Sequence, residues 1–166
     1  SLRFERYPEG VLVYNFRVSG THTYFVREAG SDAEPIWVHN AYIVRSMKVA
    51  DDDLPEVGGT ARTLGARPGT DIPVNEGMVE PETGGMSVSP SPEKLPPHRR
   101  PPEFGGSGKD PVWSMNSDEL PSELTYRPDP VNPTGHGFVE PTSEMTNERY
   151  QAALHSTRIS WKLVSP

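Results

Sequence analysis

Asn40 is the residue whose type and neighbours most directly suggest chemistry, because it follows His39 in the run IWVHNA at residues 36–41. An asparagine side-chain amide can attack its own main-chain carbonyl, which closes a succinimide and cuts the chain after Asn40. A preceding histidine can protonate the departing amide nitrogen. The pair therefore predicts that residues 1–40 release a segment that starts at Ala41. The alternative is a small β-hairpin in which His22, His39 and Asn40 are turn and strand-end residues.

Three short runs in order resemble the C-terminal end of Hint domains, the self-cleaving relatives of inteins. They are VYNFRV at residues 13–18, HTYFV at 22–26 and WVHN at 37–40. The resemblance implies that residues 1–40 are a C-terminal Hint fragment and that residues 41–166 are a separate toxin domain. It also implies that His22 is the block histidine and that His39 and Asn40 carry out autocleavage.

Two departures from the Hint pattern narrow this chemistry. Splicing needs a Cys, Ser or Thr after the asparagine, and Ala41 has no nucleophile, so cleavage without ligation is expected. The chain has no Cys, and the N-terminal part of a Hint domain is absent from it. We therefore expect a fragment of a larger precursor, in which the Asn40–Ala41 bond stays largely uncut.

The composition limits the classes of structure and partner. Only 33% of the 166 residues are hydrophobic, and 15 Gly and 19 Pro predict many loops. The net charge of −7 argues against a broad nucleic-acid groove. The lack of Cys excludes disulfides and thiolate metal sites, and the five His have no metal-ligand spacing, so no metal site is predicted. No apolar run approaches the roughly 18–20 residues of a membrane span.

The pattern of apolar residues predicts an α+β fold with short strands, long loops and few helices. A helix is expected over residues 142–157, with Thr146 as a possible cap. A final half-buried strand is expected over 158–164, with Ile159, Trp161 and Leu163 on one face. The other expected strands are 11–18, 21–26, 36–39, 42–49 and segments near 85–89, 111–115 and 135–140.

Ser87 and Ser89 would lie on one side of a strand that follows Gly84 and Gly85. Glycines let the backbone approach a ligand closely, and a hydroxyl there can hold a ribose or brace a catalytic carboxylate. The alternative is a turn followed by an edge strand.

His136 and Glu140 would point to the same side of another strand, about 13 Å apart at roughly 3.3 Å per residue. This spacing suits the two ends of one elongated ligand and is too long for an acid–base dyad. A histidine on a strand is also often structural, and Glu140 could simply end the strand before Pro141.

Arg45 could bind a phosphate in a fork, or form a surface ion pair. Residues 97–102 read PHRRPP and are the one basic cluster, which could contact nucleic acid or phosphate but also fits a solvated proline loop. The stretch GGSGK at 105–109 lacks the Walker spacing and the Ser or Thr after Lys109.

Residues 77–166 resemble the ADP-ribosyltransferase-like toxin domain first known from a type VI secretion effector. The matching stretches are GMVEPETGGMSV at 77–88, GGSGKDPVW at 105–113 and HGFVEP at 136–141, with YIVR at 42–45 as the opening strand. The resemblance implies a split β-sheet with a cleft for NAD, the substrate. There Arg45, Ser87 and Ser89 would bind NAD, while Glu140, His136 and Ser87 would be catalytic.

The resemblance also has departures, because the chain has no well-formed Ser-Thr-Ser and no Glu-x-Glu pair. Glu140 would stabilise an oxocarbenium-like transition state.

Such toxins stand behind Hint domains in polymorphic toxins of bacterial competition. This context implies a secreted effector that acts in the recipient-cell cytoplasm on a protein or nucleic acid and is neutralised by a cognate immunity protein. The alternatives are a metal-independent ribonuclease toxin using His136 and His98, and a non-catalytic segment that binds a partner through its prolines.

Overall fold

The computed structural model describes residues 23–26, 36–39 and 42–165, and only the backbone course of the first two segments. The chain divides into two compact units, Ser1–Ala41 and Tyr42–Pro166. In the first unit, β1 (Thr23–Val26) pairs antiparallel with β2 (Ile36–His39). These strands match two of the expected ones, whereas the strand expected over 11–18 lies outside the described residues.

The second unit contains two three-stranded antiparallel sheets. The first has the order β10-β6-β3, from β10 (Lys162–Leu163), β6 (Val112–Asn116) and β3 (Tyr42–Ser46). The second has the order β5-β8-β7, from β5 (Met86–Val88), β8 (Gly137–Pro141) and β7 (Leu124–Pro128). Val44 and Ser89 exchange main-chain hydrogen bonds of 2.8 and 2.9 Å, which join β3 to the end of β5.

The predicted α+β class with split sheets, few helices and long loops is confirmed. The unit also contains two short paired strands, β4 (Met78–Val79) and β9 (Met145–Thr146), and four 3₁₀ turns. The 3₁₀ turns are η1 (Pro92–Lys94), η2 (Pro102–Phe104), η3 (Ser117–Glu119) and η4 (Thr157–Ser160).

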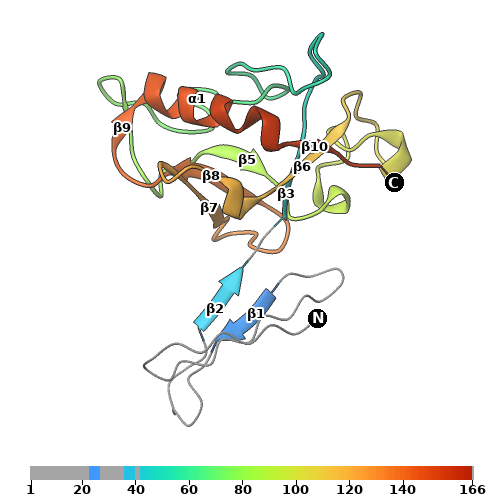
Figure 1. The fold of residues 1–166 in the computed structure, drawn as a ribbon, viewed down its shortest axis with the longest axis horizontal. Coiled ribbons are helices and arrows are strands. Elements are labelled where there is room, and N and C mark those ends of the chain that lie inside the picture. Colours follow the sequence, from blue (N-terminus) through green and yellow to red (C-terminus); the bar gives the residue numbers. More distant parts are fainter. Residues whose placement is uncertain (1–22, 27–35, 40–41, 166) are drawn as a thin grey trace. The chain divides into compact units, whose positions relative to one another are not determined.

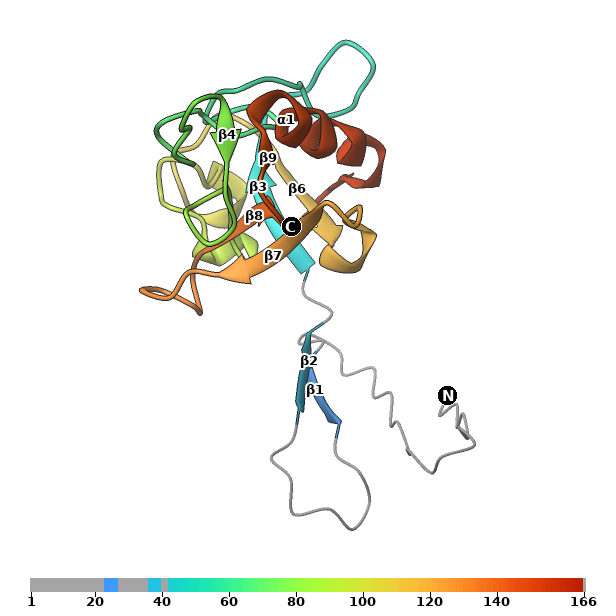
Figure 2. The ribbon, with the colours of Figure 1, turned by 90° about the vertical axis from the view of Figure 1, so that its left-hand side faces the viewer.

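The single α-helix of the described residues, α1 (Asn147–Ser156), starts later than expected. Thr146 caps it, as predicted, because its hydroxyl accepts a hydrogen bond from the Arg149 amide. The range 142–146 is not helical, since the Thr142 amide donates to the Glu123 carbonyl and Met145 and Thr146 form β9. Figures 1 and 2 show α1 lying across one side of the strands.

The core lies between α1 and the two sheets. Tyr150, Ala153 and Leu154 of α1 pack in one apolar cluster with strand residues that include Ile43 and Val139. The Tyr150 hydroxyl accepts from the Met86 amide at 2.9 Å and donates to the Val139 carbonyl at 2.6 Å, which ties the helix to β5 and β8. Core packing thus fixes the strands that carry the candidate site.

The expectation of a half-buried strand over 158–164 was wrong. Residues 157–160 form η4, and only Lys162 and Leu163 pair as a strand. Trp161 is buried, but Ile159 and Leu163 are 70% and 54% exposed. The indole N–H of the buried Trp161 donates to the hydroxyl of Thr157, the residue just after α1. The η4 turn interrupts the alternation of apolar and polar residues on which the prediction of a strand rested.

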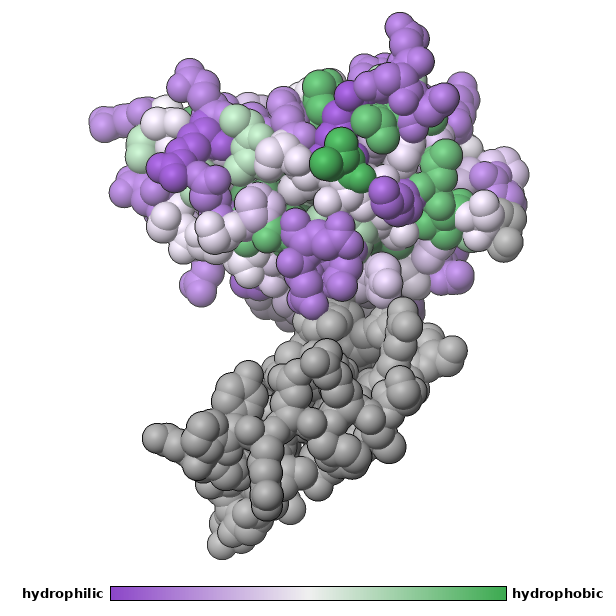
Figure 3. Space-filling view, viewed as in Figure 1, coloured by the Kyte–Doolittle hydropathy of each residue, from purple (hydrophilic) through white to green (hydrophobic). Residues whose placement is uncertain are grey.

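The surface drawn in Figure 3 is mostly hydrophilic, with separate apolar patches between the polar side chains. The large apolar side chains exposed in the described part of the chain are Tyr42, Val49, Val57, Val131, Ile159 and Leu163. Within the same part, no helix is both long and apolar enough to cross a bilayer.

Candidate active site

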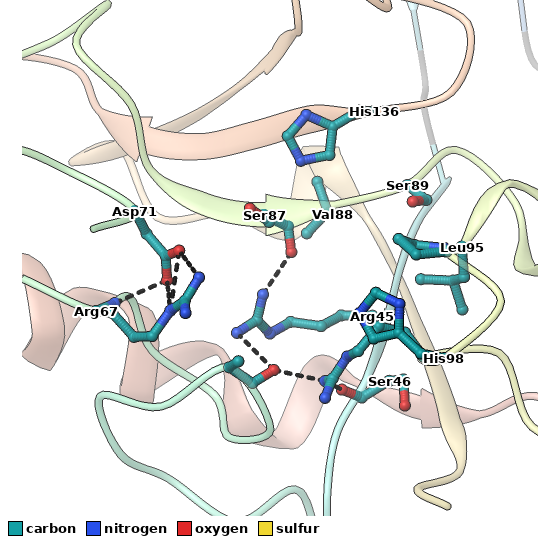
Figure 4. A pocket seen from close by; sticks show the side chains of 13 residues that line it. Arg45, Ser46, Arg67, Asp71, Ser87, Val88, Ser89, Leu95, His98 and His136 are labelled. Atoms are coloured by element: carbon teal, nitrogen blue, oxygen red, sulfur yellow. Dashed lines mark hydrogen bonds and ion pairs between the residues drawn. The ribbon is translucent and has the colours of Figure 1, made fainter. Parts of the chain in front are cut away.

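A pocket of about 220 Å³ opens where the two sheets meet. Its walls come from β3, from the long loop after it, from β5, from the proline-rich segment and from the residue before β8 (Figure 4). The lining residues are Arg45, Ser46, Ala61, Arg67, Asp71, Ser87, Val88, Ser89, Leu95, Pro96, His98, Arg99 and His136. The pocket therefore brings together four predicted site residues, Arg45, Ser87, Ser89 and His136.

Arg45 is only 5% exposed, and its hydrogen bonds to described residues all go to main-chain carbonyls. One nitrogen donates to Ser87 at 2.6 Å, and the others reach carbonyls of the loop after β3, at Thr60, Ala61, Thr63 and Gly65. Burial lowers the pKa of Arg45 to about 10, with Arg99 and Arg67 adding to the shift, so the guanidinium is still charged at neutral pH. Arg45 thus binds this loop to β5 and places a positive charge under the pocket.

Ser87 presents its hydroxyl to the pocket from the middle of β5, opposite Phe138 of β8. Among the described residues its side chain has no hydrogen-bond partner, so the hydroxyl is available to a ligand. Ser89 also lines the pocket but is buried, and its main chain is used in the junction with Val44. Of the two serines, Ser87 is the better placed for contact with a substrate.

The two glycines before β5 allow close main-chain packing. A side chain on Gly84 would meet the Asp71 carbonyl, and one on Gly85 would meet the Val139 carbonyl, at 2.3 and 2.5 Å from the added carbon. The Gly85 amide also donates to the Asp71 carbonyl. Close main-chain packing therefore explains both glycines, and the expectation that they also let a ligand approach stays a prediction.

His136 stands one residue before β8, and its ring lies edge-on to Phe138 with centroids 4.7 Å apart. Its Nδ1 is 2.8 Å from a carboxylate oxygen of Asp129. Hydrogen bonds from the Val131 amide and from His136 lower the pKa of Asp129, so this carboxylate is ionised at neutral pH and only accepts. Nδ1 must then carry the proton, which leaves Nε2 of the neutral ring as a proton acceptor.

The pocket is positive although the protein is acidic. Arg45, Arg67 and Arg99 line it, against a single carboxylate, Asp71, which pairs with Arg67. Arg99 is 18% exposed at its side chain, and burial lowers its pKa while Asp110 opposes the shift. Arg67 and Asp71 were not among the predicted site residues, because their only signal in the sequence is an opposite-charge spacing of four residues. In Figure 4 this pair and His98 lie on opposite sides of the Arg45 guanidinium.

Glu140 does not line the pocket. It is 2% exposed and accepts two 2.9 Å hydrogen bonds from Arg127 Nε, and Arg127 Nη2 lies 2.8 Å from it. Arg127 in turn lies over the Phe138 ring, 5.2 Å from its centre.

The other predicted functional residues, His22 and Asn40, lie outside the described residues, and only the backbone of His39 is described. No group of three or more potential metal ligands occurs in the part of the chain that the structure describes.

The comparison with known protein families agrees with the toxin-domain resemblance drawn from the sequence, and its match lies outside residues 1–40. Searches of curated proteins and of solved structures give no match. The family model of the Tse2 ADP-ribosyltransferase toxin matches residues 45–161, well over half of the chain and all of the pocket. This match favours ADP-ribosyl transfer over the ribonuclease alternative, and the chain belongs to the Tse2 ADP-ribosyltransferase toxin family.

Proposed function

We propose that the pocket between the two sheets binds NAD and that the toxin transfers ADP-ribose from it to a macromolecule of a target cell. ADP-ribosyltransferases use NAD as their substrate. The observation that carries the proposal is the convergence, in one pocket, of the Ser87 hydroxyl, the free nitrogen of His136 and the charge of Arg45. A hydroxyl and an imidazole suit the nicotinamide ribose, and the arginines suit the pyrophosphate.

The reaction breaks the bond between C1′ of the ribose and the nicotinamide nitrogen, and the electron pair leaves with nicotinamide. A nucleophile of the acceptor forms the new bond to C1′ and loses a proton. Nε2 of His136 can take that proton, because Nδ1 is held protonated by Asp129. Arg45 lies on β3, and its guanidinium donates to the main-chain carbonyl of Ser87 on β5. Arg45 therefore acts on the site mainly by holding the Ser87 main chain in place.

Glu140 is the carboxylate that the family resemblance assigns to stabilising the oxocarbenium-like transition state. In this structure it is paired with Arg127. Its proposed role therefore requires that Arg127 release it when NAD is bound.

The test is release of nicotinamide by the purified chain incubated with NAD and target-cell extract. We expect Ser87→Ala to reduce release by about 100-fold, the usual cost of one lost transition-state hydrogen bond. Ser122→Ala is the matched control, because Ser122 is exposed and does not line the pocket. Both variants should keep the wild-type melting temperature. Wild-type release by Ser87→Ala, or no NAD turnover by the wild-type chain, would reject the proposal.

His136→Asn separates the chemical role of His136 from its structural role. The Asn amide can still donate to Asp129 but offers no nitrogen in the position of Nε2. We expect a folded protein that binds NAD and transfers ADP-ribose at least tenfold more slowly. Unchanged transfer would remove His136 from the mechanism.

We also propose that residues 1–40 release the toxin through cyclisation of Asn40. The proposal rests on the sequence resemblance of residues 13–40 to Hint domains. Intact mass spectrometry of a longer precursor tests it, by a cut after Asn40 that Asn40→Ala abolishes. Release of the same fragment from the Asn40→Ala precursor would show that another reaction makes the cut.

The toxin family implies a target in the recipient cell, and we propose that a cognate immunity protein with a basic patch neutralises the toxin. The net charge of −7 supports such a patch. Co-purification of the toxin with the product of the neighbouring gene, at low and at high salt, tests this pairing. Binding that is equally strong at both salt concentrations would argue against an electrostatic interface.

A further inference from the structure

A second pocket, of about 230 Å³, adjoins the proposed NAD pocket. The two pockets share Ser46, His98 and Arg99 in their walls. The second one adds Arg62, Ser107, Lys109 and Asp110. Neither the mechanism nor the proposed NAD contacts use these four added residues.

The second pocket carries excess positive charge. Asp110 is its one carboxylate, and it accepts two hydrogen bonds from Arg62, of 2.6 and 2.5 Å. Arg99 lies 4.0 Å from the same carboxylate, and Lys109 forms no ion pair with another described residue. Three cationic side chains therefore face one anion, in a protein whose net charge is −7. This local excess suits a ligand with negative charge.

Two of the three cations, Arg62 and Arg99, are held in place before any ligand binds. Arg99 donates to the main-chain carbonyls of Ser46 and Ala61. The Ser107 amide donates to Pro97, which packs the glycine-rich stretch at 105–109 against the basic cluster. A side chain on Gly106 would lie 1.9 Å from the Arg100 carbonyl, so only glycine allows this contact. Preorganised donors bind an anion without a further ordering cost.

The chemistry of the walls selects phosphate over other groups. No Phe, Tyr, Trp or aliphatic side chain lines the second pocket, so an apolar group has nothing to pack against, and the only aromatic ring there is the imidazole of His98. Arginine, lysine, histidine and serine together are donors that match phosphate oxygens. The proposed NAD pocket, at about 220 Å³, is also smaller than the roughly 300–1,000 Å³ of typical ligand sites. Part of a bound dinucleotide or of an acceptor must therefore extend beyond it.

We propose that the second pocket is a phosphate-binding subsite that holds a phosphate group beside the nucleotide in the first pocket. The first part of this statement stands by itself, and only the position beside a nucleotide rests on the proposed NAD site. The phosphate can come from two sources. It is either a phosphate of the dinucleotide itself or a phosphate carried by the acceptor.

A titration with inorganic phosphate, followed by the NMR signals of the His98 ring, tests the subsite without NAD. We expect a saturable shift in the wild-type chain, because His98 lines both pockets. Lys109→Gln should weaken phosphate binding roughly tenfold, the usual effect of one charged hydrogen bond. Lys162→Gln is the matched control, since Lys162 is an exposed lysine on β10 outside both pockets.

Binding and transfer assays with Lys109→Gln then distinguish the two sources. If the dinucleotide supplies the phosphate, the variant binds NAD more weakly but binds nicotinamide mononucleotide as the wild type does. If the acceptor supplies it, NAD binding is unchanged and the KM for the acceptor rises. The proposal is overturned if the His98 signals do not respond to phosphate, if Lys109→Gln binds phosphate as the wild type does, or if neither NAD binding nor transfer changes. A failure of NAD turnover alone leaves the phosphate titration unaffected and rejects only the proposed function.

Discussion

The Arg45 guanidinium donates a 2.6 Å hydrogen bond to the main-chain carbonyl of Ser87, so two residues predicted to bind NAD are bound to each other. The contact spans 42 residues of sequence and runs from β3 to β5. It holds the strand that presents the Ser87 hydroxyl to the pocket. Arg45 therefore contributes to the fold and to the site through the same hydrogen bonds.

Arg45→Lys tests this double role, because lysine keeps the charge but cannot donate to several carbonyls in a fork. We expect the free energy of unfolding to fall by about 2–3 kcal/mol, since buried carbonyls lose their donors. Urea denaturation measures the change. Arg67→Lys is the control and should cost less than about 1 kcal/mol, because Arg67 is 43% exposed at its side chain. Equal stability of the two variants would contradict a structural role for Arg45.

Tyr150→Phe removes the hydroxyl that joins α1 to β5 and β8. Tyr150 is fully buried, and its hydroxyl serves both the Met86 amide and the Val139 carbonyl. Burial also raises the pKa of Tyr150, so the hydroxyl keeps its proton and donates to Val139 at all ordinary pH values. We expect a loss of about 2–3 kcal/mol in the free energy of unfolding, because two main-chain groups are left unsatisfied.

Tyr126→Phe serves as the control for Tyr150→Phe. Tyr126 is half-buried beside the same core, and its hydroxyl has no hydrogen bond within the described residues. This variant should change stability by less than about 0.5 kcal/mol. If both tyrosine variants have the same small effect, the bridge from α1 to the sheet does not stabilise the protein.

The strands at 86–88, 112–116 and 137–141 could be predicted from sequence, because short β-rich runs between prolines and glycines mark them. Strand β7 was missed, although it pairs along its whole length with β8. Its stretch ELTYRP has no long alternation, and only the neighbouring strand makes it a strand. The exposure of Ile159 likewise depends on the η4 turn, which the periodicity of apolar residues in the sequence does not indicate.

Of the site, the sequence could indicate residue types but not partners. Arg45, Ser87 and His136 do meet in one pocket. The spacing of His136 and Glu140 predicted one ligand between them, yet Glu140 faces Arg127, which comes from the strand that was missed. A strand pattern tells which residues share a face but not what the adjacent strand places beside them. Correct assignment of Glu140 therefore needed the pairing of β7 with β8.

Glu140→Gln has two separate expected effects. The ion pair predicts a loss of about 1–2 kcal/mol in the free energy of unfolding, because Arg127 loses its carboxylate and is 23% exposed at its side chain. The family resemblance predicts a loss of at least 100-fold in nicotinamide release. Release must be measured at a temperature where wild type and variant are both folded.

Arg127→Gln is the companion variant, since it removes the same ion pair and leaves the carboxylate. If Glu140 is catalytic, Arg127→Gln keeps more activity than Glu140→Gln at a similar stability. If the two variants have equal stability and equal activity, Glu140 acts only through its pair with Arg127. Full activity in Glu140→Gln would remove the catalytic role altogether.

Asp110→Asn should change how stability depends on pH on the acid side. Hydrogen bonds from Arg62 lower the pKa of Asp110 below its usual value of 3.8. An acid whose pKa is lower in the folded state contributes stability that is complete above the unfolded pKa. That contribution is lost as the pH falls from about 4 through the folded pKa. The variant should thus lose about 1–2 kcal/mol at pH 7 and very little at pH 2.

Urea denaturation of both proteins from pH 7 to pH 2 measures the difference between their curves. Asp52→Asn is the control, because Asp52 also has a lowered pKa from its pair with Arg158 but is 53% exposed at its side chain. Solvent screens such an exposed pair, so this variant should stay close to the wild type at every pH. Parallel curves for Asp110→Asn and the wild type would show that the Asp110–Arg62 pair does not stabilise the fold. Convergence of the two curves below pH 4 would show that the buried carboxylate that anchors Arg62 is ionised in the folded protein.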